Sequence, residues 1–178
     1  MDEELELLLD EETIDRTVTG LGERISRDYA GTDLVLVGIL KGASLFLADL
    51  ARAIAAPVDI AFLRASSYGT DTRSSGSVQI SEDLGRDVSG RHVLLVDCII
   101  DSGRTLAAVR ERVREKHPAS LRAVVLLDKK ARRTTMVPVD YVGFEVPDRF
   151  LVGYGLDRGG KYRNLPYIAA VATEEANP

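Results

Sequence analysis

Two carboxylates, two hydroxyl residues and a glycine follow closely on one another in VLLVDCIIDSGRTL, residues 93–106. They are Asp97, Asp101, Ser102, Gly103 and Thr105. An apolar, strand-like run precedes them and a helical pattern follows. Backbone N–H groups at a helix start have no partners within the helix, and the helix dipole favours an anion there. Glycine lets the backbone approach a ligand closely, and hydroxyls donate further hydrogen bonds. The pattern predicts a phosphate site.

The two carboxylates need a different task, because a carboxylate repels a phosphate. Asp97 and Asp101 could hold sugar hydroxyls, bind Mg²⁺ or accept a proton. A sugar phosphate would satisfy both halves of the motif. The alternative is an ordinary helix cap, with Asp101 or Ser102 bonding the first turn. The G-x-x-x-x-G-K-[ST] loop of nucleoside triphosphatases is absent.

Alternating strand and helix patterns must position these residues. Apolar runs predict strands at 33–40, 58–64, 92–96 and 121–127, with shorter ones at 140–144, 150–153 and 167–171. Helical spacing predicts helices from residue 14 to about 25, at 43–54 and at 104–116, although Gly20 and Gly22 weaken the first. This order predicts an α/β fold with right-handed crossovers and a parallel sheet. Ligands of such sheets bind at the carboxyl ends of the strands. Four segments should meet there: 41–42, 67–76, 97–105 and 128–129.

Composition narrows the class of protein. The 178 residues suit one domain, and 45% hydrophobic with 29% charged residues is typical of a soluble globular chain. The net charge of −5 argues against broad binding to nucleic acid or to an anionic membrane. Apolar runs such as 34–40 are too short to span a bilayer. One cysteine, Cys98, and an acidic N-terminal segment predict a cytoplasmic protein without a signal peptide.

The motif of residues 93–106 resembles the phosphoribosyl diphosphate (PRPP) signature of the type I phosphoribosyltransferases. The sequence IID at residues 99–101 of this motif resembles the hypoxanthine-guanine members in particular. Other stretches resemble the same family in the same order: GILKGA (38–43) its diphosphate loop, SSYGTDTRSSG (66–76) its lid, and LLDKKARR (126–133) with residues 142–168 its purine-binding part. The resemblance extends over about residues 8–172.

The resemblance implies a Rossmann-like, mostly parallel sheet flanked by helices. It implies one domain, residues 1–178, with a small hood subdomain built from the N-terminal segment and about residues 150–178, and a mobile lid at about 66–77. The implied activity is purine salvage: PRPP and a 6-oxopurine, hypoxanthine or guanine, give IMP or GMP and diphosphate, with Mg²⁺. Homodimers or homotetramers are usual in this family, and neither nucleic acid nor a membrane is an expected partner.

Site residues carried over from the resemblance fall into five sets. For PRPP they are Lys41, Gly42, Asp97, Asp101, Ser102, Gly103, Arg104 and Thr105; for the purine, Lys129, Phe150, Leu151 and Asp157; for the lid, Ser67 and Tyr68; for Mg²⁺, Asp157 and Asp97; and for catalysis, Asp101, Arg163 and Lys129. Asp101 is the implied general base or proton relay near purine N7. Lys129 is the implied donor to the 6-oxo group, and Phe150 is implied to stack on the base. The family often has a non-proline cis peptide in the diphosphate loop, here Leu40–Lys41.

Simpler interpretations of these residues remain open. Lys129 could belong to a solvated basic cluster, Phe150 could be a core or edge residue, and Asp157 with Arg163 could be a surface turn pair. Hypoxanthine, guanine and xanthine are not ranked by the sequence, and an enzyme for adenine or uracil is a weaker rival. A rival of another class is a regulator of the same fold, such as the RNA-binding pyrimidine-operon regulator. The acidic balance speaks against that regulator.

The chain departs from the family pattern at Cys98, which replaces the second acid of the motif, while Asp97 is a shorter first acid. A thiol cannot match a carboxylate as an acceptor for ribose hydroxyls. On the sequence we expect Cys98→Asp to tighten PRPP binding. We also expect a buried, inert thiol rather than a redox-sensitive one, because nothing basic is beside it in sequence.

Overall fold

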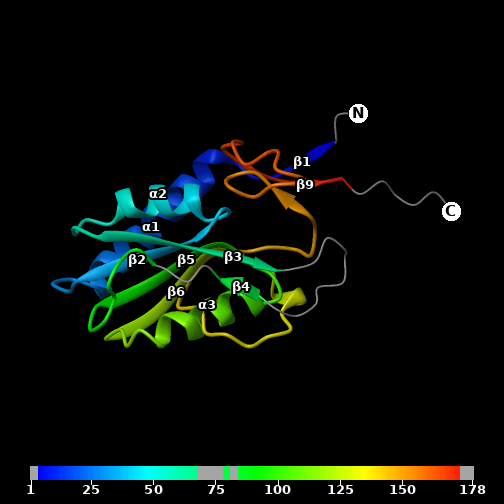
Figure 1. The fold of residues 1–178 in the computed structure, drawn as a ribbon. Coiled ribbons are helices and arrows are strands. Elements are labelled where there is room, and N and C mark those ends of the chain that lie inside the picture. The colour runs from blue at the N-terminus through cyan, green and yellow to red at the C-terminus, as the bar shows by residue number, and fades with distance from the viewer. Residues whose placement is uncertain (1–3, 68–77, 81–83, 173–178) are drawn as a thin grey trace.

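A six-stranded sheet forms the body of the molecule (Figure 1). The computed structural model describes residues 4–67, 78–80 and 84–172. The strand order is β4-β3-β2-β5-β6-β7. The strands are β2 (Leu34–Leu40), β3 (Asp59–Ser67), β4 (Val78–Ile80), β5 (His92–Ile100), β6 (Ser120–Asp128) and β7 (Tyr141–Glu145). Neighbours from β3 to β7 are parallel, and β4 pairs antiparallel with the end of β3. The predicted α/β fold with a mostly parallel sheet is confirmed.

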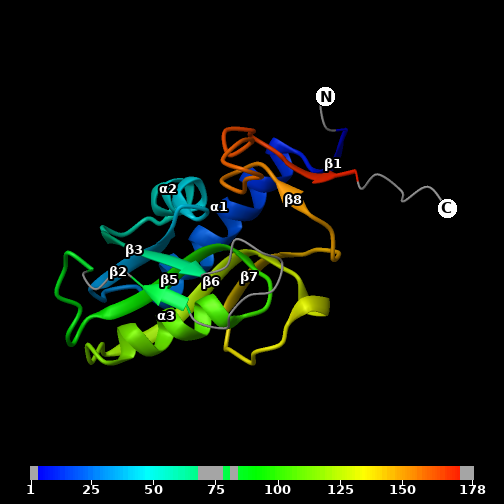
Figure 2. The same ribbon diagram turned by 45° about the vertical axis from the view of Figure 1, so that its right-hand side comes forward.

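Helices cover both faces of this sheet (Figures 1 and 2). Helices α1 (Glu11–Asp28) and α2 (Ser44–Ala53) lie on one face, and α3 (Arg104–Arg114) lies on the other. The sheet separates two apolar clusters, and the central strands are therefore largely apolar, as expected for strands buried on both faces.

Helix α1 contains the two glycines that weakened its prediction. Asp10 caps the helix, because its carboxylate accepts the N–H of Thr13 at 2.8 Å. A Cβ at Gly22 would lie 2.5 Å from the Cβ of Ala53. Gly22 therefore lets α1 pack closely on the end of α2, which compensates for its low helix propensity.

A second, three-stranded antiparallel sheet joins the two ends of the described chain. Its order is β1-β9-β8, with β1 (Leu5–Leu9), β8 (Leu151–Val152) and β9 (Ile168–Val171). Figure 1 shows it beside one end of the large sheet, above the carboxyl ends of the central strands. The sheet is built from an N-terminal and two C-terminal strands, the parts of the chain from which the resemblance implied a hood. Strand β1 was not predicted, and neither was β4; pairing with a distant strand, rather than local pattern, decides both.

The largest correction to the predicted elements concerns β5. The predicted strand ended at Val96, before the first acid, but β5 runs on to Ile100. Asp97, Ile99 and Ile100 stay in register with β6, opposite Val125, Leu127 and Asp128. Sheet pairing therefore overrides the low strand propensity of aspartate, and the motif begins inside the ladder.

The strand order reverses between β2 and β5. From β2 the chain crosses through α2 to β3 on one side, and from β5 it crosses through α3 to β6 on the other. Open α/β sheets bind ligands in the crevice at such a switch point, outside the carboxyl ends of the strands. Strands β2 and β5 both end at this crevice. Their last residues lead there into Lys41 and Asp101.

Candidate active site

Two cavities lie at the carboxyl ends of these strands and share lining residues. One has a volume of about 420 Å³ and includes residues of the diphosphate loop and of the motif. The other has a volume of about 580 Å³ and lies between the motif and the hood. Ile99, Asp101, Leu156 and Asp157 line both. The two cavities therefore form a single composite site with Asp101 at the junction.

The smaller cavity collects the residues predicted to bind PRPP. Those that line it are Lys41, Gly42, Asp97, Asp101, Ser102, Gly103, Thr105 and Arg163. The Leu40–Lys41 peptide is cis, as the resemblance implied. Arg104 is the exception, since its exposed side chain does not line either cavity. Of the two residues predicted for the lid, Ser67 is the last residue of β3, and only its backbone is described. Tyr68 lies outside the described residues.

The start of α3 has only a weak side-chain cap. The N-cap residue is Gly103, in the left-handed region at φ +85°, and no side chain bonds the first turn from this position. The capping interpretation is borne out for Ser102 in part: its Oγ accepts a hydrogen bond from the N–H of Arg104, although the N–O distance of 3.4 Å is long for such a bond. Free backbone N–H groups at a helix start of this kind suit an anion such as phosphate.

The larger cavity contains the residues predicted to bind a purine. Lys129 is only 5% exposed, so it is not part of a solvated cluster. Its Nζ is 3.7 Å from Asp101 Oδ2. The Phe150 ring is 51% exposed and lines this cavity with Leu151, which leaves an aromatic face open to a planar ligand. The Arg158 guanidinium lies 5.7 Å from the centre of that ring.

Asp157 and Arg163 form an ion pair, as the interpretation of a surface turn predicted. Both residues also line the smaller cavity. Asp157 Oδ1 is 2.6 Å from Arg163 Nη2, and Asp157 Oδ2 accepts the N–H of Gly160 at 2.7 Å. Arg163 Nη1 also donates to the carbonyl of Gly155 at 2.6 Å. The pair is therefore fixed in place at the edge of the cavity.

Arg132 is a site residue to which the sequence interpretation gave no role. Its Nε is 3.4 Å from Asp101 Oδ1 and 3.6 Å from Asp148 Oδ1, and it lines the larger cavity. The only signal was its place in the basic stretch DKKARR. Ile99 and Leu156, which form apolar walls of both cavities, carried no polar signal at all.

Asp97 is the acid whose ionisation the fold changes most plainly. Burial raises the pKa of its carboxyl to about 7, although backbone N–H groups of Cys98 and Ile99 bond to it and act in the opposite direction. The Cys98 N–H donates to Oδ1 at 2.8 Å. The folded protein therefore holds a proton here over a pH range in which the unfolded chain has lost it.

This gives a pH prediction for the ligand-free protein. Because the folded state binds more protons than the unfolded state between about pH 4 and about pH 7, the free energy of unfolding should fall as the pH rises through that window and then level off. In Asp97→Asn we expect the free energy of unfolding to decrease by about 1–3 kcal/mol less across this pH window than in the natural protein. Urea unfolding of both proteins across the window measures it, and parallel pH profiles would contradict it.

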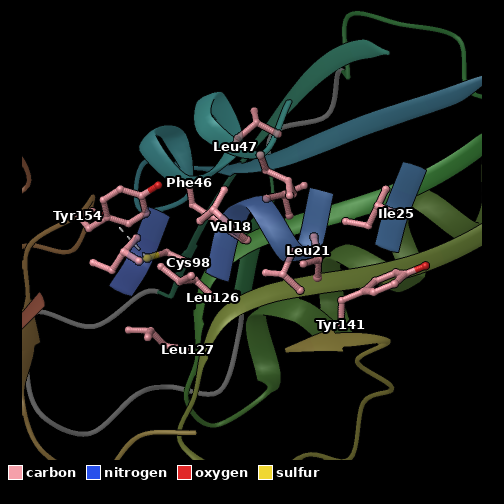
Figure 3. Packing of buried hydrophobic residues seen from close by; sticks show 14 of the residues in the cluster. Val18, Leu21, Ile25, Phe46, Leu47, Cys98, Leu126, Leu127, Tyr141 and Tyr154 are labelled. Carbon is pink, nitrogen blue, oxygen red and sulfur yellow. Dashed lines mark hydrogen bonds between the residues drawn. The ribbon is translucent and has the colours of Figure 1, made fainter. Parts of the chain in front are cut away.

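Cys98 lies within the apolar core rather than in the cavity. Figure 3 shows its sulfur among buried side chains, near Tyr154 and Leu126. The residue is 0% exposed, and its thiol donates to the Tyr154 carbonyl at 3.5 Å. Burial raises the pKa of this thiol well above its usual range. The expectation of a buried, inert thiol therefore agrees with the structure.

The same burial reverses our expectation for Cys98→Asp. A carboxylate at this position would be surrounded by apolar atoms and would face the Tyr154 carbonyl, so it gains no contact with the cavity. Relative to Cys98→Ser, we expect the free energy of unfolding to drop by about 2–4 kcal/mol at neutral pH, and by less toward about pH 4, where the new carboxyl is neutral. Chemical unfolding at both pH values measures it; an equally stable variant with a lower KM for PRPP would restore the original expectation.

A larger cavity, of about 890 Å³, lies elsewhere, between the first turn of α1, helix α2 and residues 164–166. None of the predicted site residues lines it. Its walls carry carboxylates of Asp10, Glu11, Glu12, Asp15 and Asp49. We place the active site in the two smaller cavities, because donors suited to phosphate and an aromatic wall meet there.

The fold is that of an α/β protein with a composite ligand site at the switch point of its parallel sheet. The family model described as "Phosphoribosyl transferase domain" matches residues 5–158, and the chain belongs to this family. The hypoxanthine-guanine phosphoribosyltransferase of Aquifex aeolicus is 48% identical over 168 residues, which cover 94% of each chain. The hypoxanthine phosphoribosyltransferase of Haemophilus influenzae is 44% identical over 174 residues, covering 96% of this chain and 97% of that one.

Solved structures agree with this assignment. A hypoxanthine phosphoribosyltransferase from Staphylococcus aureus superposes with a TM-score of 0.90 at 42% identity, covering 97% of this chain and 94% of that chain. A hypoxanthine-guanine phosphoribosyltransferase from Bacillus anthracis gives a TM-score of 0.88 at 40% identity, covering 97% and 100%. The regulatory alternative is not favoured, since these relatives are named as transferases. No helix in the described part of the chain is long and apolar enough to cross a membrane.

Proposed function

We propose that this protein transfers the phosphoribosyl group of PRPP to N9 of a 6-oxopurine, hypoxanthine or guanine, in purine salvage. The products are the nucleoside monophosphate and diphosphate. One observation carries the proposal: a cavity suited to a sugar phosphate and a cavity with an aromatic wall meet at a single carboxylate, Asp101. The two substrates of such a transfer must meet in the same way.

On the purine side, buried and aromatic groups would select the base. Lys129 donates to the 6-oxo group, and because its charge is held in a buried position this bond is charge-assisted and strong. Phe150 stacks on the base, and the backbone of Leu151 contacts its edge. Asp101 accepts the purine proton as the general base or its relay, with Lys129 and Arg132 close enough to orient the carboxylate. The adenine alternative fits less well, because adenine lacks the oxo acceptor.

On the PRPP side, residues 101–105 hold the 5′-phosphate at the start of α3. Asp97 accepts ribose hydroxyls. Lys41, Gly42 and Arg163 hold the diphosphate, whose negative charge increases as the bond to ribose C1 breaks. Fixed donors aimed at developing charge lower the barrier most effectively, because they need no reorganisation during the reaction.

The acids of the phosphate cavity also fit Mg²⁺. Magnesium sites in phosphate-transfer enzymes commonly use one or two carboxylates together with substrate phosphates. Asp97 and Asp157 both line the cavity and would hold the ion with the diphosphate of PRPP. Within the described residues, no group of three or more acids, histidines or cysteines is placed to hold a metal ion. When bound, Mg²⁺ would neutralise charge on the leaving diphosphate.

Two further parts of the chain complete the proposal. The segment 66–77 would act as a lid, with Ser67 and Tyr68 closing over a ribose carbon that is reactive toward water. The β1-β9-β8 sheet would act as the hood of a single domain. Both roles exclude water from the composite site.

We further propose a cytoplasmic homodimer or homotetramer. Support for self-association comes from apolar side chains on one side of the molecule: Ile60 and Phe62 on β3 are 39% and 42% exposed, and Leu45 on the adjoining α2 is 39% exposed. Exposed apolar groups of this kind mark interaction surfaces more often than chance. The mass in solution, compared between the natural protein and Phe62→Lys, tests this assignment.

The test of the activity is nucleotide formation from PRPP and Mg²⁺ with hypoxanthine, guanine, xanthine, adenine and uracil in parallel. Turnover of hypoxanthine or guanine, abolished by leaving out PRPP, is the expected result. Turnover of adenine or uracil instead would overturn the purine assignment. Absence of turnover with every base would overturn the enzymatic role.

A further inference from the structure

The segment 133–135 holds the phosphate loop from behind. The carbonyl oxygen of Ser102 accepts the N–H of Thr134 at 3.1 Å and the N–H of Thr135 at 2.9 Å. A Cβ at Gly103 would lie 2.5 Å from the carbonyl oxygen of Thr135 and 3.3 Å from Cδ of Arg133. In the described structure, none of Arg133, Thr134 and Thr135 lines either cavity.

This contact sets the direction of one peptide group in the cradle. In a planar trans peptide, the C=O and the N–H of the same unit point to opposite sides. Because the Ser102 carbonyl is held by residues 134 and 135 outside the cavity, the N–H of Gly103 must point the other way, toward the cavity. Two hydrogen bonds on the outer side of the loop thus fix a donor on its inner side.

Arg133 anchors the segment to the sheet. Its Nη2 donates to Oδ1 of Asp128 at 2.6 Å, and the two side chains are only 16% and 4% exposed. Asp128 ends β6 and directly precedes Lys129. A charge-assisted hydrogen bond between two largely buried groups is strong and directional. The chain of contacts therefore runs from the end of β6 through Arg133 to the phosphate loop.

We propose that Arg133 is a positioning residue for the phosphate of the nucleotide: through Asp128 it fixes the segment 133–135, which in turn aims the Gly103 N–H at the phosphate. This inference rests on the proposed placement of the 5′-phosphate on residues 101–105. It assigns a role to a residue that does not touch substrate. It also makes binding of the phosphate depend on an ion pair located beside the purine-binding lysine.

The test compares a ligand that carries the phosphate with one that lacks it. Dissociation constants of inosine monophosphate and inosine are measured by calorimetry for the natural protein, for Arg133→Met and for Lys130→Met. Lys130 is the matched control, because it occupies the same short turn and pairs with Glu145 at 2.7 Å, but its side chain is 63% exposed. The readout is the preference for the monophosphate over inosine.

We expect Arg133→Met to reduce this preference about tenfold while inosine affinity changes less than about threefold, as for the weakening of one charge-assisted hydrogen bond. Lys130→Met should keep the full preference. An unchanged preference in Arg133→Met, or an equal loss for both ligands, would overturn the inference. A natural protein with no preference would instead overturn the phosphate assignment itself.

Arg133→Met leaves the Asp128 carboxylate buried without its partner and could fail to fold. The double variant Arg133→Met with Asp128→Asn removes that charge. It should show the same reduced preference for the monophosphate, and a full preference in the folded double variant would count against the inference.

Discussion

Replacing Asp101 by asparagine should lower kcat with hypoxanthine by about 10²–10⁴-fold, the usual contribution of a positioned general base. Asparagine keeps the shape of the side chain but cannot accept the purine proton. The KM for PRPP should stay the same or fall, because the substitution removes a negative charge near an anionic substrate. Steady-state kinetics over a range of pH measures both quantities, and the variant should lose the acidic limb of the kcat profile.

Glu145→Gln is the matched control for this change. It is the same carboxylate-to-amide replacement, and Glu145 pairs with Lys130 on the surface at 59% exposure and lines neither cavity. We expect its kcat to equal that of the natural protein. A loss of less than about threefold in Asp101→Asn would show that the proton leaves the purine by another route, since a base contributes far more.

Gly155→Ala should produce the second large effect, through the contact between the hood and the diphosphate loop. Gly155 has φ +97°, and a Cβ there would lie 2.1 Å from the carbonyl oxygen of Gly42. The Gly155 backbone cannot yield without moving Arg163, which donates to the Gly155 carbonyl. We expect a loss of about 2–4 kcal/mol in the free energy of unfolding, from overpacking and from a backbone conformation unfavourable to alanine.

The same displacement should raise the KM for PRPP, because Gly42 and Arg163 both line the phosphate cavity. Gly159→Ala separates the two causes: its φ is +60°, but a Cβ there meets nothing within 4 Å. That control should lose only about 1–2 kcal/mol and keep its KM. Equal effects of the two substitutions on KM would show that the Gly155–Gly42 contact does not position the diphosphate loop.

Local sequence patterns predicted the parallel sheet and its helices, because burial on both faces leaves continuous apolar runs such as 34–40. They failed where distant pairing decides. Strand β5 continues through Asp97 because β6 stays in register with it, and β1 forms because β9 lies beside it. Neither partner is visible in the local pattern.

The site could be predicted where a motif combined several residue types at fixed spacing. The segment 97–105 and Lys129 line the two cavities with few exceptions. The burial of Cys98 was predicted, but its distance from the cavity was not, because two adjacent residues of a strand point to opposite faces and the sequence does not say which face is the cavity. Arg132 and Arg133 are neighbours in one basic stretch, yet one faces the ligand cavity and the other lies behind the phosphate loop. Arg132 is the last residue of the short helical turn Lys130–Arg132, and Arg133 follows directly after this turn.

The place of β9 in the small sheet bears on how the enzyme is made. Because β9 is the middle strand, neither β1 nor β8 has its partner until residues 168–171 have been synthesised. A nascent chain can complete the large sheet and the phosphate loop while Phe150 and Leu151, next to and within β8, are still without support. The purine half of the site therefore matures last, after the ribosome has translated almost the whole of the described chain. Truncations before β9 also remove Ile168 and Ala170, which belong to the apolar cluster that packs against α1 and α2, and should therefore destabilise the large sheet as well.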